Sequence, residues 1–187
     1  MADNDLLTFE GVVPDIELRS ESKRESAIRF MKWGEIGRTE EGLETFNEGA
    51  FDDNRPEDIV LRMEHEGPPV GIGIGLERDK IGQIGVFRVA PTARGDEALT
   101  LAKEGLYKGA SPMFRRDNAV TTYEKTQDGQ RLARRMKVDA REVSMTWRPT
   151  YQGTAVLYAR SEAEADSSQE ETAVAEGIPA PACGRRW

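Results

Sequence analysis

The sequence predicts a mainly β fold (α+β) with one principal helix, and three observations lead to that prediction. Short segments with alternating apolar and polar residues recur along the 187 residues, as is typical of half-buried strands. The segment 95–108 instead repeats its apolar residues at three- and four-residue intervals, which predicts a helix. Because strands outnumber helices, a closed or nearly closed antiparallel β-barrel is favoured over a fold of alternating strands and helices.

The first half of the chain contains strand patterns separated by charged or glycine-containing turns. We expect strands at 6–13, 27–33, 59–65, 70–76 and 81–90. The segment 44–51 is compatible with either a strand end or a turn. In the strand 59–65, alternation places His65 on the same face as three apolar side chains, so we expect it at the strand end, pointing inward.

A run of alternating glycines, from Gly71 to Gly75, leaves one face of its strand without side chains. Another backbone, a packed helix or a ligand can therefore approach that face closely. The spacing matches neither the dinucleotide-binding nor the phosphate-binding loop motif, both of which open a helix. Pro68 and Pro69 are expected to interrupt the chain just before this strand.

The expected helix, 95–108, carries acidic residues in its first turn and is followed by Gly109, and both features are typical of helix ends. Beyond it, strands are expected at 110–114, 119–125, 131–138, 143–147 and 154–158. The segment Gln127-Asp128-Gly129 predicts a hairpin turn between two of these strands.

Length and composition predict one domain, residues 1–160, followed by an acidic, disordered tail, residues 161–187. The formal charge of −8 argues against a protein whose main task is to neutralise nucleic-acid phosphates, and so against a nucleic-acid-binding barrel. No segment is apolar enough for a membrane span and no signal-peptide pattern is present, so we expect an intracellular site. The single cysteine, Cys183, excludes a disulfide framework and a zinc site built on several thiolates, and we expect no cofactor.

Three residues invite a mechanistic interpretation, although each also has a simpler explanation. His65 is the only histidine and could act as a general base, but a lone histidine is more often a surface or hydrogen-bonded residue. Ser111 follows small residues that would let a substrate approach, but a serine needs a base to become a nucleophile. Glu142 could orient the imidazole, or could pair with Arg141 or Arg135 on a solvated strand face.

Several segments, taken in order, resemble the prohead proteases of tailed bacteriophages, a family related in fold to the herpesvirus assemblins. They are FNEGAF (46–51), VLRMEH (60–65), the glycine-rich hairpin (74–85), ALTLAKEGLYKGASPMF (98–114) and EVSMTWRPTY (142–151). The resemblance spans about residues 5–158, most of the chain. It implies a barrel like that of the herpesvirus protease, with the principal helix before the nucleophile.

The resemblance also implies a serine endopeptidase with Ser111 as nucleophile, His65 as base and Glu142 as the acidic third member. Such an enzyme works in the host cytoplasm, inside the phage procapsid, where it cuts scaffold or the scaffold-like segment of the major capsid protein, and often itself. The expected partners are these substrate proteins, and a homo-oligomer is possible. Neither a nucleic acid nor a membrane is expected as a partner. The alternative is a non-catalytic capsid-assembly or scaffold component that uses the same barrel.

Overall fold

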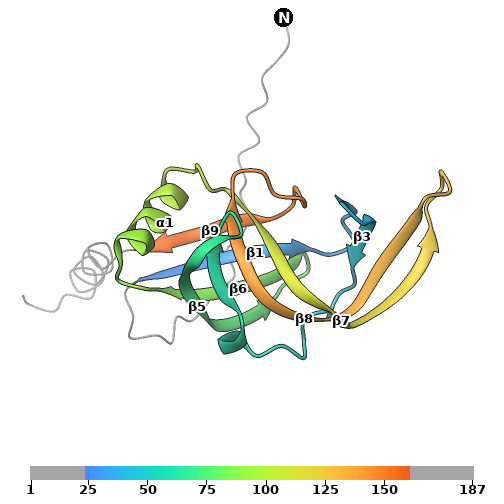
Figure 1. Cartoon of the computed structure of the whole chain (residues 1–187), viewed down its shortest axis with the longest axis horizontal. Coiled ribbons are helices and arrows are strands. Elements are labelled where there is room, and N and C mark those ends of the chain that lie inside the picture. The colour runs from blue at the N-terminus through green and yellow to red at the C-terminus, as the bar shows by residue number, and fades with distance from the viewer. Residues whose placement is uncertain (1–23, 161–187) are drawn as a thin grey trace, which may run out of the picture.

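The computed structural model describes residues 24–160, which form nine strands, one α-helix and one short 3-10 helix (Figure 1). In chain order the elements are β1 (Glu25–Lys32), β2 (Gly37–Thr39), β3 (Gly42–Phe46), η1 (Pro56–Asp58), β4 (Val60–Met63), β5 (Glu66–Arg78), β6 (Gly82–Val89), α1 (Ala93–Lys103), β7 (Gly109–Lys125), β8 (Arg131–Thr146) and β9 (Ala155–Arg160). The expected mainly β fold with one principal helix is confirmed. The strand expected at 6–13, the tail 161–187 and Cys183 lie outside the described residues.

All nine strands belong to one sheet, in the order β2-β3-β8-β4-β5-β6-β1-β9, with β7 on the second edge of β8. Most neighbours are antiparallel, but β3 and β4 both run parallel to β8, so the expectation of a purely antiparallel sheet is wrong. The length of β8, 16 residues, explains this arrangement. One edge of β8 pairs first with β3 and then with β4, while its other edge pairs with β7 along most of its length.

Closure of the sheet into a barrel is not confirmed, because the ladder of paired strands ends at β2 and β9. Two hydrogen bonds nevertheless connect the region of β9 with the start of β7. The N–H of Val156 donates to the carbonyl of Lys108 at 3.2 Å, and the N–H of Ala110 donates to the hydroxyl of Thr154 at 3.0 Å. Strand β9 and the start of β7, which occupies the other edge of β8, therefore approach each other at one point without forming a continuous ladder.

Strands β7 and β8 are each continuous where the sequence predicted two shorter strands. Their hairpin runs across the molecule and its end projects on the right-hand side in Figure 1. The polar residues 115–118 suggested a break, but the two strands absorb them in a register shift, and an exposed ladder tolerates polar side chains. The predicted hairpin turn is confirmed, with Gly129 at a φ of 81° and its N–H donating to the carbonyl of Thr126.

Helix α1 begins and ends earlier than the predicted 95–108. Thr92 is its N-cap, since the hydroxyl of this residue accepts the N–H of Gly95 at 3.1 Å. Gly105 stops the helix with a left-handed φ of 67°, and the carbonyl of Leu101 then accepts the N–H groups of Leu106 and Tyr107. Gly105, rather than Gly109, therefore supplies the end of the helix.

The hydrophobic core is built around aromatic side chains from β1, β3 and the loop after β3. Phe46 and Phe51 stack with ring centroids 5.5 Å apart, and Phe30 meets Phe51 edge-on at 5.1 Å. Segment 44–51, which the sequence left open, is thus a strand end followed by turns. Helix α1 adds Ala98 and Leu99 to the same core.

The glycine run in β5 allows a close approach, and of the three neighbours that the sequence left open, another backbone makes it. A Cβ atom placed on Gly73 would lie 2.2 Å from the carbonyl oxygen of Pro56, in η1. Pro68 and Pro69, in contrast, do not interrupt the chain but lie exposed inside β5. The ladder between β4 and β5 is irregular there, so the missing N–H groups break no pairing.

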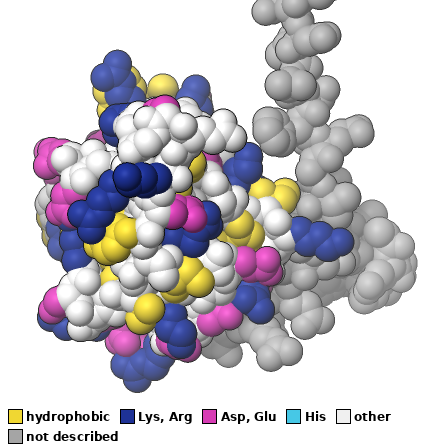
Figure 2. Space-filling view, turned by 90° about the vertical axis from the view of Figure 1, so that its right-hand side faces the viewer, with side chains coloured by type: hydrophobic (Ala, Val, Ile, Leu, Met, Phe, Trp, Pro, Cys, Tyr) yellow, Lys and Arg dark blue, Asp and Glu magenta, His cyan; other side chains and the backbone are white. Residues whose placement is uncertain are grey.

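The described residues carry no net charge, because they contain 22 acidic and 22 basic residues. The formal charge of −8 therefore belongs to the segments before and after them. Figure 2 looks onto the right-hand side of Figure 1, and it shows Lys and Arg interspersed with Asp and Glu on this face. Among residues 24–160, α1 falls short of the length and apolar character that a bilayer crossing requires.

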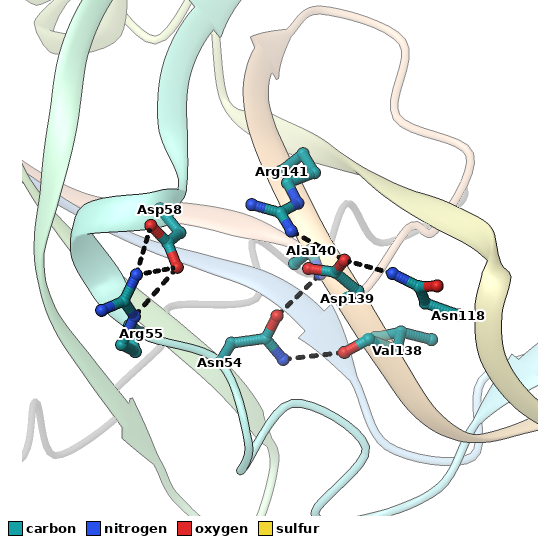
Figure 3. A network of polar contacts seen from close by, with 8 residues as sticks. All are labelled: Asn54, Arg55, Asp58, Asn118, Val138, Asp139, Ala140 and Arg141. Carbon is teal, nitrogen blue, oxygen red and sulfur yellow. Dashed lines mark hydrogen bonds and ion pairs between the residues drawn. The ribbon is translucent and has the colours of Figure 1, made fainter.

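One asparagine side chain completes the edge of β8 between the parts that pair with β3 and β4 (Figure 3). The amide nitrogen of Asn54 donates to the carbonyl of Val138 at 2.9 Å, and its amide oxygen accepts the N–H of Ala140 at 2.7 Å. The side chain thus takes the place of a peptide group from a neighbouring strand. This contact fixes β8 just before it reaches Glu142.

Candidate active site

His65 lies in a two-residue turn between β4 and β5, not at the end of a strand as predicted. Strand β4 ends at Met63, which pairs with Glu66, and the two residues between them have left-handed φ angles of 52° and 58°. The His65 side chain is 33% exposed, so the expectation that it points into the core is also wrong. Left-handed backbone costs of order 1 kcal/mol or more at each non-glycine residue, so other contacts must hold this turn.

Glu64, the first residue of the turn, supplies some of these contacts. Its N–H donates to the carbonyl of Met145 at 3.0 Å. Its carboxylate accepts the hydroxyl of Thr146 at 2.9 Å and the N–H of Trp147 at 3.1 Å. The turn is therefore fastened to the end of β8. No sequence pattern distinguishes Glu64 from the other carboxylates, and its position next to the single histidine is the one signal that could have identified it.

His65 and Glu142 are in direct contact. Nδ1 of His65 lies 2.6 Å from Oε1 of Glu142, whose side chain on β8 is only 9% exposed. The parallel register of β4 and β8 explains the contact, since it pairs Met63 with Met145 and brings the following turn back over β8. Contact through Nδ1 leaves the other ring nitrogen, Nε2, for a different partner.

The partners expected for Glu142 in the simpler explanation lie elsewhere. Arg141 pairs with Asp139, and Arg135 pairs with Glu44. The cation beside Glu142 is instead Arg62 of β4, with its Nε 3.0 Å from Oε2 but not aligned for a hydrogen bond. Glu142 therefore has one carboxylate oxygen near a guanidinium and the other at the imidazole.

Ser144, also missed by sequence analysis, joins the two partners of this contact. Its side chain is fully buried. Its hydroxyl donates to Oε1 of Glu142 at 2.9 Å and accepts the backbone N–H of His65 at 3.0 Å. A serine in a strand pattern gives no sequence signal for such a role.

Ser111 lies on β7, directly opposite Ser144 in the antiparallel register, and Met113 lies opposite Glu142. Directly paired residues project from the same face with Cβ atoms about 4.5–5.5 Å apart. Ser111 and Glu142 therefore share one face of the sheet, and the turn that carries His65 is bonded to Ser144 between them. Within residues 24–160, the hydroxyl of Ser111 forms no hydrogen bond, to His65 or to another group, and its residue is partly exposed.

Tyr107, just before β7, lies close to Glu64 in the turn between β4 and β5. Its burial raises the pKa of its phenol, and the nearby carboxylate of Glu64 raises it further. The phenol therefore keeps its proton at neutral pH and can serve as a hydrogen-bond donor near the turn. No pattern in the sequence distinguishes Tyr107 from the other tyrosines.

Four cavities lined by described residues are formed by other side chains. One, of about 450 Å³, lies between β3 and the β7–β8 hairpin and is lined by residues such as Glu44, Arg116 and Arg135. The residues that line these four cavities do not include His65, Ser111 or Glu142. Over residues 24–160, no three His, Cys, Asp or Glu side chains converge in a way that could hold a metal ion.

A carboxylate in contact with an imidazole, beside a strand that carries a partly exposed serine, has the components of acyl-transfer chemistry. No curated protein matches the sequence. The model that describes the caudovirus prohead serine proteases matches residues 15–169, most of the chain. The chain therefore belongs to the caudovirus prohead serine protease family.

Proposed function

We propose that this protein is a serine endopeptidase that cleaves scaffold, or the scaffold-like segment of the major capsid protein, during prohead maturation. Membership of the family supports a serine peptidase role in capsid maturation, inside the procapsid. The residues His65, Ser111 and Glu142, the named substrates and cleavage of the enzyme itself are our proposal. The observation that carries it is the 2.6 Å contact between His65 Nδ1 and Glu142 Oε1 on the sheet face that also carries Ser111.

In the proposed mechanism, the hydroxyl oxygen of Ser111 attacks the scissile carbonyl while Nε2 of His65 accepts the hydroxyl proton. His65 then gives this proton to the leaving amine, which leaves an acyl group on Ser111. Water, activated by the same imidazole, releases the acyl group and restores the serine. Glu142 holds the imidazole through Nδ1 and stabilises the imidazolium that forms in each transition state.

Ser111 is a better nucleophile candidate than Ser144, the other serine at this site. Ser144 is fully buried and its hydroxyl already donates to Glu142, so a peptide carbonyl has no path to it. Ser111 is partly exposed, and its hydroxyl has no partner within the described chain. Next to it on the same strand face, the half-exposed Met113 offers an apolar contact for a substrate side chain.

A fluorophosphonate probe tests the proposal, because it reacts only with an activated serine. We expect the wild-type chain to be labelled and to cleave scaffold, and Ser111→Ala to do neither while it folds normally. Ser26→Ala is the matched control, since Ser26 is a buried serine of β1 that donates to the carbonyl of Tyr158. Labelling of Ser111→Ala would show that another residue is the nucleophile. An unlabelled wild-type chain that enters the procapsid would favour the alternative, a non-catalytic assembly component.

A further inference from the structure

The hydroxyl of Ser144 is bonded to both partners of the imidazole–carboxylate contact. It accepts the N–H of His65 at 3.0 Å and donates to Oε1 of Glu142 at 2.9 Å. The same Oε1 atom lies 2.6 Å from Nδ1 of His65. A single hydroxyl thus closes a ring that runs from the main chain of His65 through its imidazole and the carboxylate and back.

This ring supplies two constraints that the strand pairing does not. The N–H of His65 belongs to a residue with a φ of 58°, outside the ladder between β4 and β5, and Ser144 is its hydrogen-bond partner. The carboxylate of Glu142 has two oxygens, and Ser144 fixes the one that faces the imidazole. Without the hydroxyl, both the turn and the carboxylate rotamer lose a contact.

We propose that Ser144 is a positioning residue that holds the His65 imidazole and the Glu142 carboxylate in register with each other. A contribution of Ser144 to catalysis rests on the proposed function. Its hydrogen bonds to His65 and Glu142 are observed and do not depend on that proposal. Ser144 does not touch substrate, because it is fully buried. Its influence reaches the reaction through the proton affinity and the orientation of the imidazole.

Removal of the Ser144 hydroxyl should change the proton affinity of the His65 imidazole in one direction only. In Ser144→Ala the carboxylate loses a donor, so its negative charge is less stabilised by the protein. The imidazole–carboxylate pair then holds its proton more tightly, because protonation of the ring relieves the uncompensated charge. The pH at which half of the imidazole has lost its proton should therefore rise, by less than the roughly one unit that loss of a whole hydrogen bond to a charged group would give, because the carboxylate is charged on both sides of this titration.

The chain contains one histidine, so NMR of the ring nitrogens follows His65 without ambiguity. The experiment compares the imidazole titration of the wild-type chain, Ser144→Ala, Ser144→Thr and Ser26→Ala, all full length. We expect an upward shift in Ser144→Ala, a wild-type midpoint in Ser26→Ala, and recovery toward it in Ser144→Thr, which keeps a hydroxyl. Thermal unfolding of each variant establishes that the folded protein is being titrated.

The rate of fluorophosphonate labelling as a function of pH is the second readout. In Ser144→Ala the rise of this rate with pH should move upward with the NMR midpoint, and the plateau should fall about tenfold because the imidazole is less well oriented. An NMR midpoint that stays unchanged or falls in Ser144→Ala overturns the inference. A wild-type chain that takes no label, together with the shifted midpoint, would contradict the proposed function while supporting the role of Ser144.

Discussion

Replacing Glu142 by glutamine removes the charge beside the imidazole but keeps the size of the side chain. Nδ1 of His65 and Oε1 of Glu142 lie 2.6 Å apart, which places the centres of the two charges about 4 Å apart in an imidazolium–carboxylate pair. At an effective dielectric constant of about 20, unit charges at this distance interact by roughly 4 kcal/mol. That energy corresponds to about a 10³-fold change in rate if it acts only in the transition state.

Two features of the site change the interaction energy expected between the imidazolium and the carboxylate. The His65 side chain is 33% exposed, so water screens part of the interaction. The new amide nitrogen would either face the guanidinium of Arg62 or displace the acceptor at Nδ1, and both arrangements are unfavourable. We therefore expect Glu142→Gln to lower kcat/KM for a scaffold-derived peptide by about 10²- to 10³-fold, less than the loss expected for His65→Ala.

Glu44→Gln is the matched control for this experiment. The Glu44 side chain is also 9% exposed, and it contacts Arg135 and the hydroxyl of Tyr151, but no histidine. Glu44→Gln breaks an ion pair that is buried on both sides and should destabilise the protein by about 3–5 kcal/mol, whereas Glu142→Gln should cost less because the side chains of Arg62 and His65 are 30% and 33% exposed. Rates are compared per folded molecule, determined by urea unfolding. Equal losses in the two variants would refute a special role for the charge beside His65.

Two further predictions concern the sheet and its response to pH. Gly73→Ala should lower the free energy of unfolding, measured in urea, by about 1–3 kcal/mol, because the new Cβ would lie 2.2 Å from the carbonyl oxygen of Pro56. In the control Gly75→Ala the new Cβ is 3.5 Å from its nearest neighbour, and the loss should be less than about 0.5 kcal/mol. Equal losses in the two variants would contradict the packing argument. For Asp79, burial acts to raise the pKa, but hydrogen bonds from two backbone N–H groups and Arg29 outweigh it and hold the pKa below its usual value. This carboxylate therefore stabilises the fold fully above about pH 4 and loses that contribution as pH falls through its lower folded-state pKa. Asp79→Asn should weaken the dependence of the unfolding free energy on acidic pH. An unchanged dependence would contradict a stabilising role of the Asp79 charge.

The sequence predicted those parts of the fold that depend on local patterns. Alternation located most strands, and the glycine run correctly indicated a close neighbour, although not that this neighbour is the backbone of Pro56 at Gly73. The helix end at Gly105 was missed because the apolar spacing continues past the residue that adopts a left-handed φ. The parallel pairing of β3 and β4 with β8 could not be predicted, since the pattern of a strand does not identify its partner.

At the candidate site, too, local sequence patterns did not reveal the contacts between residues that are distant in the chain. The alternation that includes His65 continues unbroken through the turn, so only the contacts of Glu64 and His65 with β8 reveal where β4 ends. The simpler explanation of Glu142 could have been questioned from the sequence, since adjacent residues of a strand point to opposite faces and Arg141 cannot share the face of Glu142. The guanidinium that does so comes from Arg62, a residue 80 positions earlier.

The separation of the proposed residues along the chain has a consequence for how the candidate site assembles. His65 and Glu142 are 77 residues apart, and β8 must be synthesised and must pair with β4 before their side chains can meet. Contacts between such distant segments form late in folding, because the intervening loop must first be closed. A fragment that ends before β8 therefore cannot assemble the carboxylate–imidazole pair, even though it contains His65 and the whole of β4.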